Sequence, residues 1–127
     1  MSESPKILLV DDDRQLVRFL QKTLEADGCT VTATTSGKQA LAGLRASVPD
    51  LFILDLNMPS PDGFELLKTV RSEFPYLRVL AISGFLDGVL LEAAACLGAF
   101  ATLPKPIDPG ALVIKVREVL GTHKSTQ

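Results

Sequence analysis

The sequence alternates regularly between short apolar runs and longer segments whose apolar residues recur every three or four positions. The short runs have the length and aliphatic or β-branched composition of strands, and the longer segments have the spacing of one helix face. Strands are predicted at residues 6–10, 30–34, 51–54, 78–82 and 100–103. Strict alternation of strand and helix with short connections favours a parallel sheet that helices cover on both faces.

Polar and helix-breaking residues mark where the predicted helices begin and end. Short polar side chains that can cap a helix precede three of them: Asp13, Ser36 and Asp108. Pro109 then takes the first helical position of the last helix, where a missing N–H does no harm. Glycine or proline follows the end of three helices: Gly28, Pro75 and Gly98.

The order of the strands follows from their composition. The first, third and fourth strands are the most apolar and belong in the middle of the sheet, whereas the polar second and the short fifth belong at its edges. With right-handed crossovers, the order 2-1-3-4-5 satisfies these conditions. This is the flavodoxin-like version of the doubly wound α/β fold, in which the first and third strands are neighbours.

Length and charge limit the classes of protein to which the chain can belong. Its 127 residues suit one domain, with a core of about 6–120 and polar ends at 1–5 and 121–127. The net charge of -2 and the lack of a basic patch give no sign of nucleic-acid binding. No apolar run approaches the ~20 residues of a membrane span, and the first residues lack the apolar core of a signal peptide. We therefore expect a cytoplasmic protein.

Two cysteines, Cys29 and Cys96, lack the spacing of metal ligands. In a cytoplasmic protein both should be reduced, and we expect both to be buried as small hydrophobic residues.

Acidic side chains follow two of the predicted strands. Asp11 and Asp12 come directly after the first strand, and Asp55 comes directly after the third. Because these strands are neighbours, the three carboxylates should converge at the carboxyl edge of the sheet, where doubly wound folds place their ligands. Unpaired carboxylates would repel one another there, and a hard divalent cation such as Mg²⁺ is the simplest relief. Asp55 taken alone could be a metal ligand, a nucleophile or a helix cap.

The fourth and fifth strands are followed by residues that suit a phosphoryl group. Ser83 and Lys105 bring a hydroxyl and an ammonium to the same edge of the sheet as the carboxylates. Both groups can donate hydrogen bonds to phosphate oxygens. No glycine-rich loop follows the first strand, which argues against a nucleotide or flavin site.

Five motifs occur along the chain: Val10-Asp11-Asp12, Leu54-Asp55, Asn57-Met58-Pro59 with Asp62-Gly63, Ser83-Gly84, and Lys105-Pro106. Each alone is weak, but together and in this order the chain resembles the receiver domain of bacterial two-component response regulators. It is similar to the chemotaxis and sporulation single-domain regulators. The resemblance covers about residues 6–120.

The resemblance implies a signalling switch rather than an enzyme. Asp55 would accept a phosphoryl group from a sensor histidine kinase or phosphotransfer protein. Ser83 would bond a phosphoryl oxygen and shift inward on activation, and Lys105 would pair with the acyl phosphate. The resemblance also implies a cis peptide bond between Lys105 and Pro106. Four residues would hold Mg²⁺, the last through its backbone carbonyl: Asp11, Asp12, Asp55 and Asn57.

Two other functions remain open at this stage. An aspartyl-phosphate phosphohydrolase-like enzyme would need a second acid two residues after its nucleophile, where this chain has Asn57. A binding module that works without phosphorylation would need none of the site residues.

For the output, the apolar helix at about 87–97 is either a wide buried stripe or, with the fifth strand and last helix, a docking face for an output protein or dimer mate.

Some residues have simpler interpretations or depart from the family pattern. Asp62 should order the turn before Gly63, and His123 should be solvated in the polar tail.

In many relatives an aromatic residue stands where this chain has Thr102, with Phe100 two residues earlier. We therefore expect coupling through Ser83 alone or through another side chain.

Phe85 lies two residues beyond Ser83, near the rim of the predicted site. Its bulky apolar side chain should hinder the water that hydrolyses the phosphoryl group, which predicts a long-lived phosphoprotein. Phe85→Ala should therefore dephosphorylate faster, as measured by loss of the phosphoryl mass with time. An unchanged rate would contradict this role.

Overall fold

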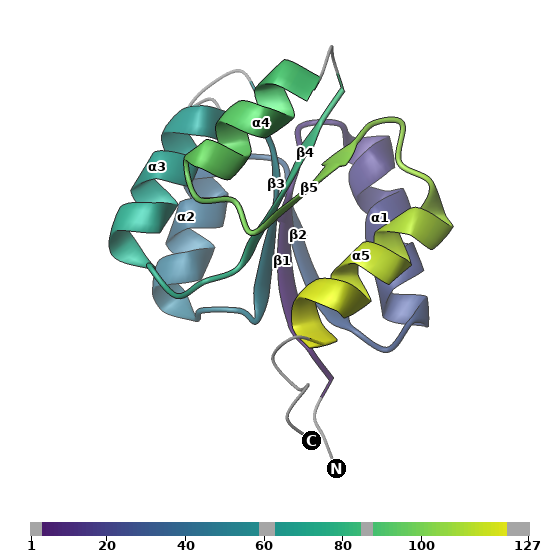
Figure 1. Ribbon diagram of the computed structural model, residues 1–127. Coiled ribbons are helices and arrows are strands. Elements are labelled where there is room, and N and C mark those ends of the chain that lie inside the picture. The colour runs from purple at the N-terminus through teal and green to yellow at the C-terminus, as the bar shows by residue number, and fades with distance from the viewer. Residues whose placement is uncertain (1–3, 59–62, 85–87, 122–127) are drawn as a thin grey trace.

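Five parallel strands form one sheet in the order β2-β1-β3-β4-β5, as predicted. The computed structural model describes residues 4–58, 63–84 and 88–121 (Figure 1). The strands are β1 (Lys6–Val10), β2 (Thr30–Thr34), β3 (Leu51–Asp55), β4 (Val79–Ser83) and β5 (Ala101–Pro104). The helices are α1 (Arg14–Ala26), α2 (Gly37–Ala46), α3 (Gly63–Glu73), α4 (Gly88–Cys96) and α5 (Pro109–Gly121).

Helices cover both faces of the sheet, with α1 and α5 on one side and α2, α3 and α4 on the other (Figure 1). Side chains of each strand alternate between the two layers, so Ile53 packs in the core with α1 and α5, and Leu54 packs in the core with α2 and α3. Every residue of β3 and β4 is buried, whereas β2 and β5 are partly exposed. This burial agrees with the predicted central and edge strands.

The predicted caps of three helices are confirmed. Side chains of the three capping residues accept hydrogen bonds from backbone N–H groups in the first turn: Asp13, Ser36 and Asp108. After α1 and α4 the chain adopts φ angles of 94° at Gly28 and 105° at Gly98, which glycine allows without steric cost.

Several strand ends and one burial prediction differ from the sequence-based expectations. The third strand extends one residue further than predicted, to Asp55, because the parallel ladder continues through this polar residue. The fourth and fifth strands are each shifted by one residue, from 78–82 to Val79–Ser83 and from 100–103 to Ala101–Pro104. Cys29 is buried as expected, but the prediction for Cys96 is wrong, since its side chain is exposed at the end of α4. Alanines on several sides of α4 leave its apolar pattern without a clear inner face.

Three residues that the sequence singled out lie outside the described part of the chain: Asp62, Phe85 and His123. Among the residues that are described, no helix combines the length and the apolar character needed to cross a membrane.

Gly63 allows α3 to begin directly against the end of β3. A Cβ atom at this position would clash with the Cα of Leu56 and would lie 2.5 Å from the carbonyl oxygen of Asp55. Because both neighbours are backbone atoms in a buried strand end, neither can move without shifting Asp55 itself.

We expect Gly63→Ala to lower the free energy of unfolding by more than about 3 kcal/mol, since the added methyl group overpacks rigid backbone. Gly43→Ala is the matched control within α2, where the new Cβ would meet only Leu8 side-chain atoms at 3.6 Å and beyond. That change should raise stability by about 0.5–1 kcal/mol, because alanine is the better helix former. Urea unfolding of both variants measures the contrast, and equal stabilities would contradict the close approach.

Candidate functional site

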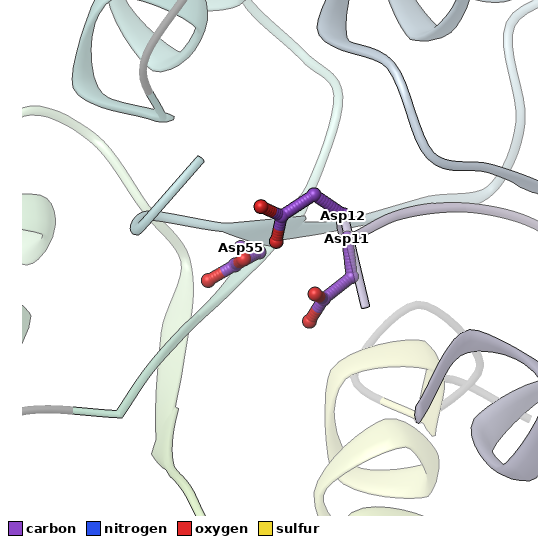
Figure 2. Close-up of side chains that lie close together, drawn as sticks. All are labelled: Asp11, Asp12 and Asp55. Atoms are coloured by element: carbon purple, nitrogen blue, oxygen red, sulfur yellow. The ribbon is translucent and has the colours of Figure 1, made fainter. Parts of the chain in front are cut away.

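Three carboxylates gather at the carboxyl edge of the sheet, as Figure 2 shows. Asp11 and Asp12 follow β1, and Asp55 is the last residue of the neighbouring β3. One oxygen from each lies within 4.8 Å of the others, with Asp11 and Asp55 buried and Asp12 exposed. The predicted convergence is therefore confirmed.

One oxygen of each buried carboxylate holds the chain just beyond its strand. Asp11 Oδ1 accepts a hydrogen bond from the backbone N–H of Asp13 at 3.0 Å, and Asp55 Oδ1 accepts one from Asn57 at 3.0 Å. The other oxygen of each, Oδ2, is buried without a hydrogen-bond partner among the described residues. Each carboxylate thus uses one oxygen to shape the loop, while Oδ2 of Asp55 accepts no hydrogen bond among these residues and Oδ2 of Asp11 faces the Lys105 ammonium.

Lys105 brings the ammonium that the sequence predicted. Its Nζ lies 3.0 Å from Asp11 Oδ2 and 3.4 Å from Asp55 Oδ1, so the ammonium forms ion pairs with both buried carboxylates. The backbone N–H of Lys105 donates to the carbonyl of Ser83 at 2.8 Å, which fixes the residue after β5 against β4. The peptide bond between Lys105 and Pro106 is cis, as predicted.

Ser83, the last residue of β4, is buried beside this group. Its Oγ donates a hydrogen bond to Oδ1 of Asn57 at 3.1 Å, and the N–H of Gly84 donates to the same atom at 3.0 Å. The sequence predicts a metal-binding backbone carbonyl at Asn57 and, by the resemblance, a place near the rim of the site, but it does not predict these side-chain hydrogen bonds. Its position in the motif was visible, but nothing in the sequence indicates where its amide points.

Burial and neighbouring charge determine the electrostatics of the site. Burial raises the pKa of Asp11 to about 6, and the charge of Asp55 acts in the same direction against the Asp13 N–H and Lys105. Burial opposes the charge on Lys105, but the ion pair with Asp11 and the charge of Asp55 raise the pKa of its ammonium. Lys105 is therefore charged at neutral pH.

The donor atoms fit a metal ion. Three carboxylates face one ammonium, so negative charge is in excess when all are ionised. All the available ligands are hard oxygens, and two of them are buried without a hydrogen bond. The triad of Asp11, Asp12 and Asp55 can thus hold a metal ion.

Residues 7–117 match the family model described as the response regulator receiver domain. The chain belongs to this family. Receiver domains of response regulators are signalling switches rather than classical enzymes, and they imply a kinase as partner. The acidic pocket and Lys105 are consistent with a phospho-accepting receiver of a two-component system.

Known regulatory proteins resemble the chain in sequence and in structure. The transcriptional regulatory protein CpxR of Klebsiella pneumoniae is 43% identical over 126 residues, which cover 96% of this chain and 52% of CpxR. The chain therefore spans about half the length of this curated relative. A putative response regulator from Chloroflexus aurantiacus superposes with a TM-score of 0.89 at 31% identity, covering 94% of this chain and 99% of its own. The chemotaxis response regulator CheY4 of Vibrio cholerae gives 0.84 at 30% identity, covering 91% and 98%.

Position 102 holds a threonine, Thr102, rather than an aromatic residue, and Phe100 does not take the place of an aromatic side chain there. Phe100 precedes β5 and is 51% exposed. The Arg78 guanidinium lies 4.7 Å from the centre of its ring. Arg78 immediately precedes β4, so this pair is at the amino edge of the sheet, opposite the acidic pocket.

The raised pKa of Asp11 predicts how pH acts on the metal-free receiver. The folded state binds this proton more tightly than the unfolded state, whose carboxyl has a pKa near 3.8. As pH rises from about 4 to about 6, Asp11 therefore lowers the free energy of unfolding, by on the order of 2 kcal/mol. Asp11→Asn keeps an Oδ1 acceptor for the Asp13 N–H and removes the titration.

The measurement is urea unfolding of both proteins in a metal chelator at several pH values. Asp11→Asn should gain stability relative to the wild type across this interval, and its advantage should persist at pH 7. A stability difference that stays constant from pH 4 to pH 7 would contradict the raised pKa.

Proposed function

We propose that Asp55 is the phospho-acceptor of this receiver and takes its phosphoryl group from a sensor histidine kinase or a phosphotransfer protein. The observation that carries the proposal is the Oδ2 atom of Asp55, which is buried without a hydrogen bond and lies on a carboxylate beside Lys105. An oxygen that accepts no hydrogen bond keeps its electron pairs available for attack on phosphorus.

The metal of this receiver is proposed to be Mg²⁺. The carboxylates of Asp11, Asp12 and Asp55, with the backbone carbonyl of Asn57, would hold it. This set of oxygen ligands is typical of Mg²⁺, which also keeps waters and binds phosphate oxygens. When bound, the ion supplies positive charge to the oxygens of the transferred group.

The side chains of the site then divide the work of phosphoryl transfer. Asp55 Oδ2 forms the new bond to phosphorus, and the bond to the donor imidazole breaks with its electron pair on the leaving nitrogen. The Lys105 ammonium, already charged and within 3.4 Å of Asp55, stabilises the negative oxygens. The Ser83 hydroxyl donates a hydrogen bond to one of them.

The output of the switch is proposed to be protein contact through the α4–β5–α5 face. Exposed apolar side chains on or beside these elements include Phe100, just before β5, at 51% and Ile114, on α5, at 60%. Of the described α4 side chains only Ala94 is fully buried, which favours a docking face over a wide buried stripe. An output protein or a dimer mate would cover these residues. We place the exchange in the cytoplasm, where the two free cysteines stay reduced.

Incubation with a small acyl phosphate, followed by intact mass measurement, tests the phospho-acceptor. We expect the wild type to gain the mass of one phosphoryl group when Mg²⁺ is present and to gain none in a chelator. Asp55→Asn should gain none under either condition, because the amide is not a nucleophile for this transfer.

Asp50→Asn is the matched control. Asp50 is an exposed carboxylate that accepts a hydrogen bond from the backbone N–H of Lys6 at the amino edge of the sheet. This variant should be phosphorylated like the wild type. Phosphorylation of folded Asp55→Asn would overturn the assignment, and continuous consumption of the acyl phosphate would instead indicate a phosphohydrolase.

A further inference from the structure

Arg71, in the last turn of α3, holds the turn that leads from this helix to β4. Its Nη1 donates a hydrogen bond to the carbonyl of Pro75 at 3.3 Å. Its Nη2 donates to the carbonyls of Phe74, at 3.3 Å, and Leu77. The planar guanidinium therefore holds three backbone carbonyls that follow the negative end of the helix dipole.

The aliphatic part of the Arg71 side chain packs against Gly98, which lies two residues beyond α4. A Cβ atom at Gly98 would clash with Arg71 Cδ and would lie 2.9 Å from its Cγ. The φ angle of Gly98 is 105°, which already favours glycine for conformational reasons. Glycine at this position thus permits the turn and also leaves room for the arginine side chain.

The turn at Gly98 fixes where α4 ends and where β5 begins. The N–H of Ala99 donates back to the carbonyl of Ala94 at 3.0 Å, a hydrogen bond that is typical of a helix ending at glycine. The next N–H, that of Phe100, donates to the carbonyl of Val79 at 2.8 Å and so joins the chain to β4. Both α4 and β5 belong to the proposed docking face, so the position of this turn determines part of its shape.

The surroundings of Arg71 differ from those of another arginine in the last turn of a helix. Arg45, on α2, is exposed and forms a two-bonded ion pair with Glu73, at 2.9 and 2.5 Å. Among the described residues Arg71 has no ion pair, its Nε is buried without a hydrogen-bond partner, and burial lowers its pKa. Arg71 has thus lost hydration to contact the backbone of two turns, which a solvated surface arginine would not do.

We propose that Arg71 is a positioning residue for the α4–β5–α5 face, because its guanidinium holds the turn after α3 while its aliphatic part holds the Gly98 turn after α4. It thereby links two connections at the amino edge of the sheet, opposite the acidic pocket. The use of this face for docking rests on the proposed function. The placing of the two turns does not, so it can be tested on the unphosphorylated protein.

A double-mutant cycle tests the contact between Arg71 and Gly98. Gly98→Ala should shift the urea midpoint of the wild type about two to four times as far as it shifts that of Arg71→Ala. The reason is that only the wild type keeps the side-chain atoms that the new methyl group meets. The strain of alanine at a positive φ angle is present in both backgrounds and cancels. Equal shifts would overturn the contact.

Gly28→Ala is the matched control for the cycle. Gly28 has a φ angle of 94° after α1, and a Cβ atom there would meet nothing within 4 Å. This change should shift the midpoint equally in the wild type and in Arg71→Ala, since it adds backbone strain without a clash. A difference between the two backgrounds at Gly28 as large as the one at Gly98 would overturn the assignment to a direct contact.

Hydrogen exchange, followed by NMR, separates the two parts of the arginine side chain. The Leu77 amide, which donates to the Phe74 carbonyl, reports the turn held by the guanidinium, and the Ala99 amide reports the Gly98 turn. In Arg71→Ala both amides should exchange about three- to tenfold faster than in the wild type. Arg71→Lys keeps the aliphatic part and the charge but lacks the planar group of donors, so only Leu77 should exchange faster.

Arg45→Ala is the control for the exchange experiment, because it removes an exposed ion pair with Glu73 and should leave both amides unchanged. Unchanged exchange of both amides in Arg71→Ala would overturn the proposal. The Cys29 amide closes the end of α1 as Ala99 closes that of α4, and no arginine side chain is packed on the glycine before it. Equal acceleration at Cys29 would indicate a general loss of stability and would also overturn the positioning role.

Phosphorylation with a small acyl phosphate and Mg²⁺ distinguishes this inference from the proposed function. Arg71→Ala should gain the mass of one phosphoryl group as the wild type does, because Arg71 lies at the opposite edge of the sheet from Asp55. If neither protein gains a phosphoryl group, the proposed function is overturned, and the double-mutant cycle and the exchange rates still decide the role of Arg71.

Discussion

The burial of two carboxylates beside one ammonium is the constraint on which the rest of this structure depends. Asp11 and Asp55 are removed from water, and Lys105 alone cannot neutralise both. In a region of low dielectric such an excess of negative charge is unfavourable, which is why burial raises the pKa of Asp11 to about 6. The resting site therefore carries more negative charge than Lys105 neutralises. Because the fold buries this excess charge, binding of a cation there would be favourable.

The sheet makes this arrangement possible from residues that are far apart in the sequence. Asp11, Asp55, Ser83 and Lys105 all stand at or just after the carboxyl end of a parallel strand. The order β2-β1-β3-β4-β5 brings the ends of β1 and β3 together and sets β4 and β5 beside them. Two separate hydrophobic cores fix the strands against movement, so the charged ends keep their spacing despite their repulsion. The cost of crowding like charges is thus offset far from the site, by apolar burial on both faces of the sheet.

Much of the fold and the charged part of the site could be predicted from the sequence because both follow from periodic patterns. Alternating strands and helices fix the sheet, and a polar residue after each apolar run marks its carboxyl end. What could not be predicted depends on details that composition does not contain. Cys96 lies on a helix so rich in alanine that its inner face was not visible, and its exposure was missed. The amide of Asn57 takes its direction from partners 26 and 27 residues away, and no local pattern encodes that contact.

Charge and geometry are handled by different groups in this site. Asp11, Asp55 and Lys105 determine how much charge the pocket can accept, whereas neutral hydrogen bonds to Asn57 determine where residues 83–84 lie. In the proposed switch, an added phosphoryl group alters the first set directly and the second through the single proton of Ser83. Because a charged acceptor is stronger than an amide oxygen, the direction of the change is set by the phosphoryl group. The side chain of Asn57 thus holds residues 83–84 through neutral contacts, while its backbone N–H orders the carboxylate of Asp55, so one residue connects the loop after β4 to the proposed phospho-acceptor.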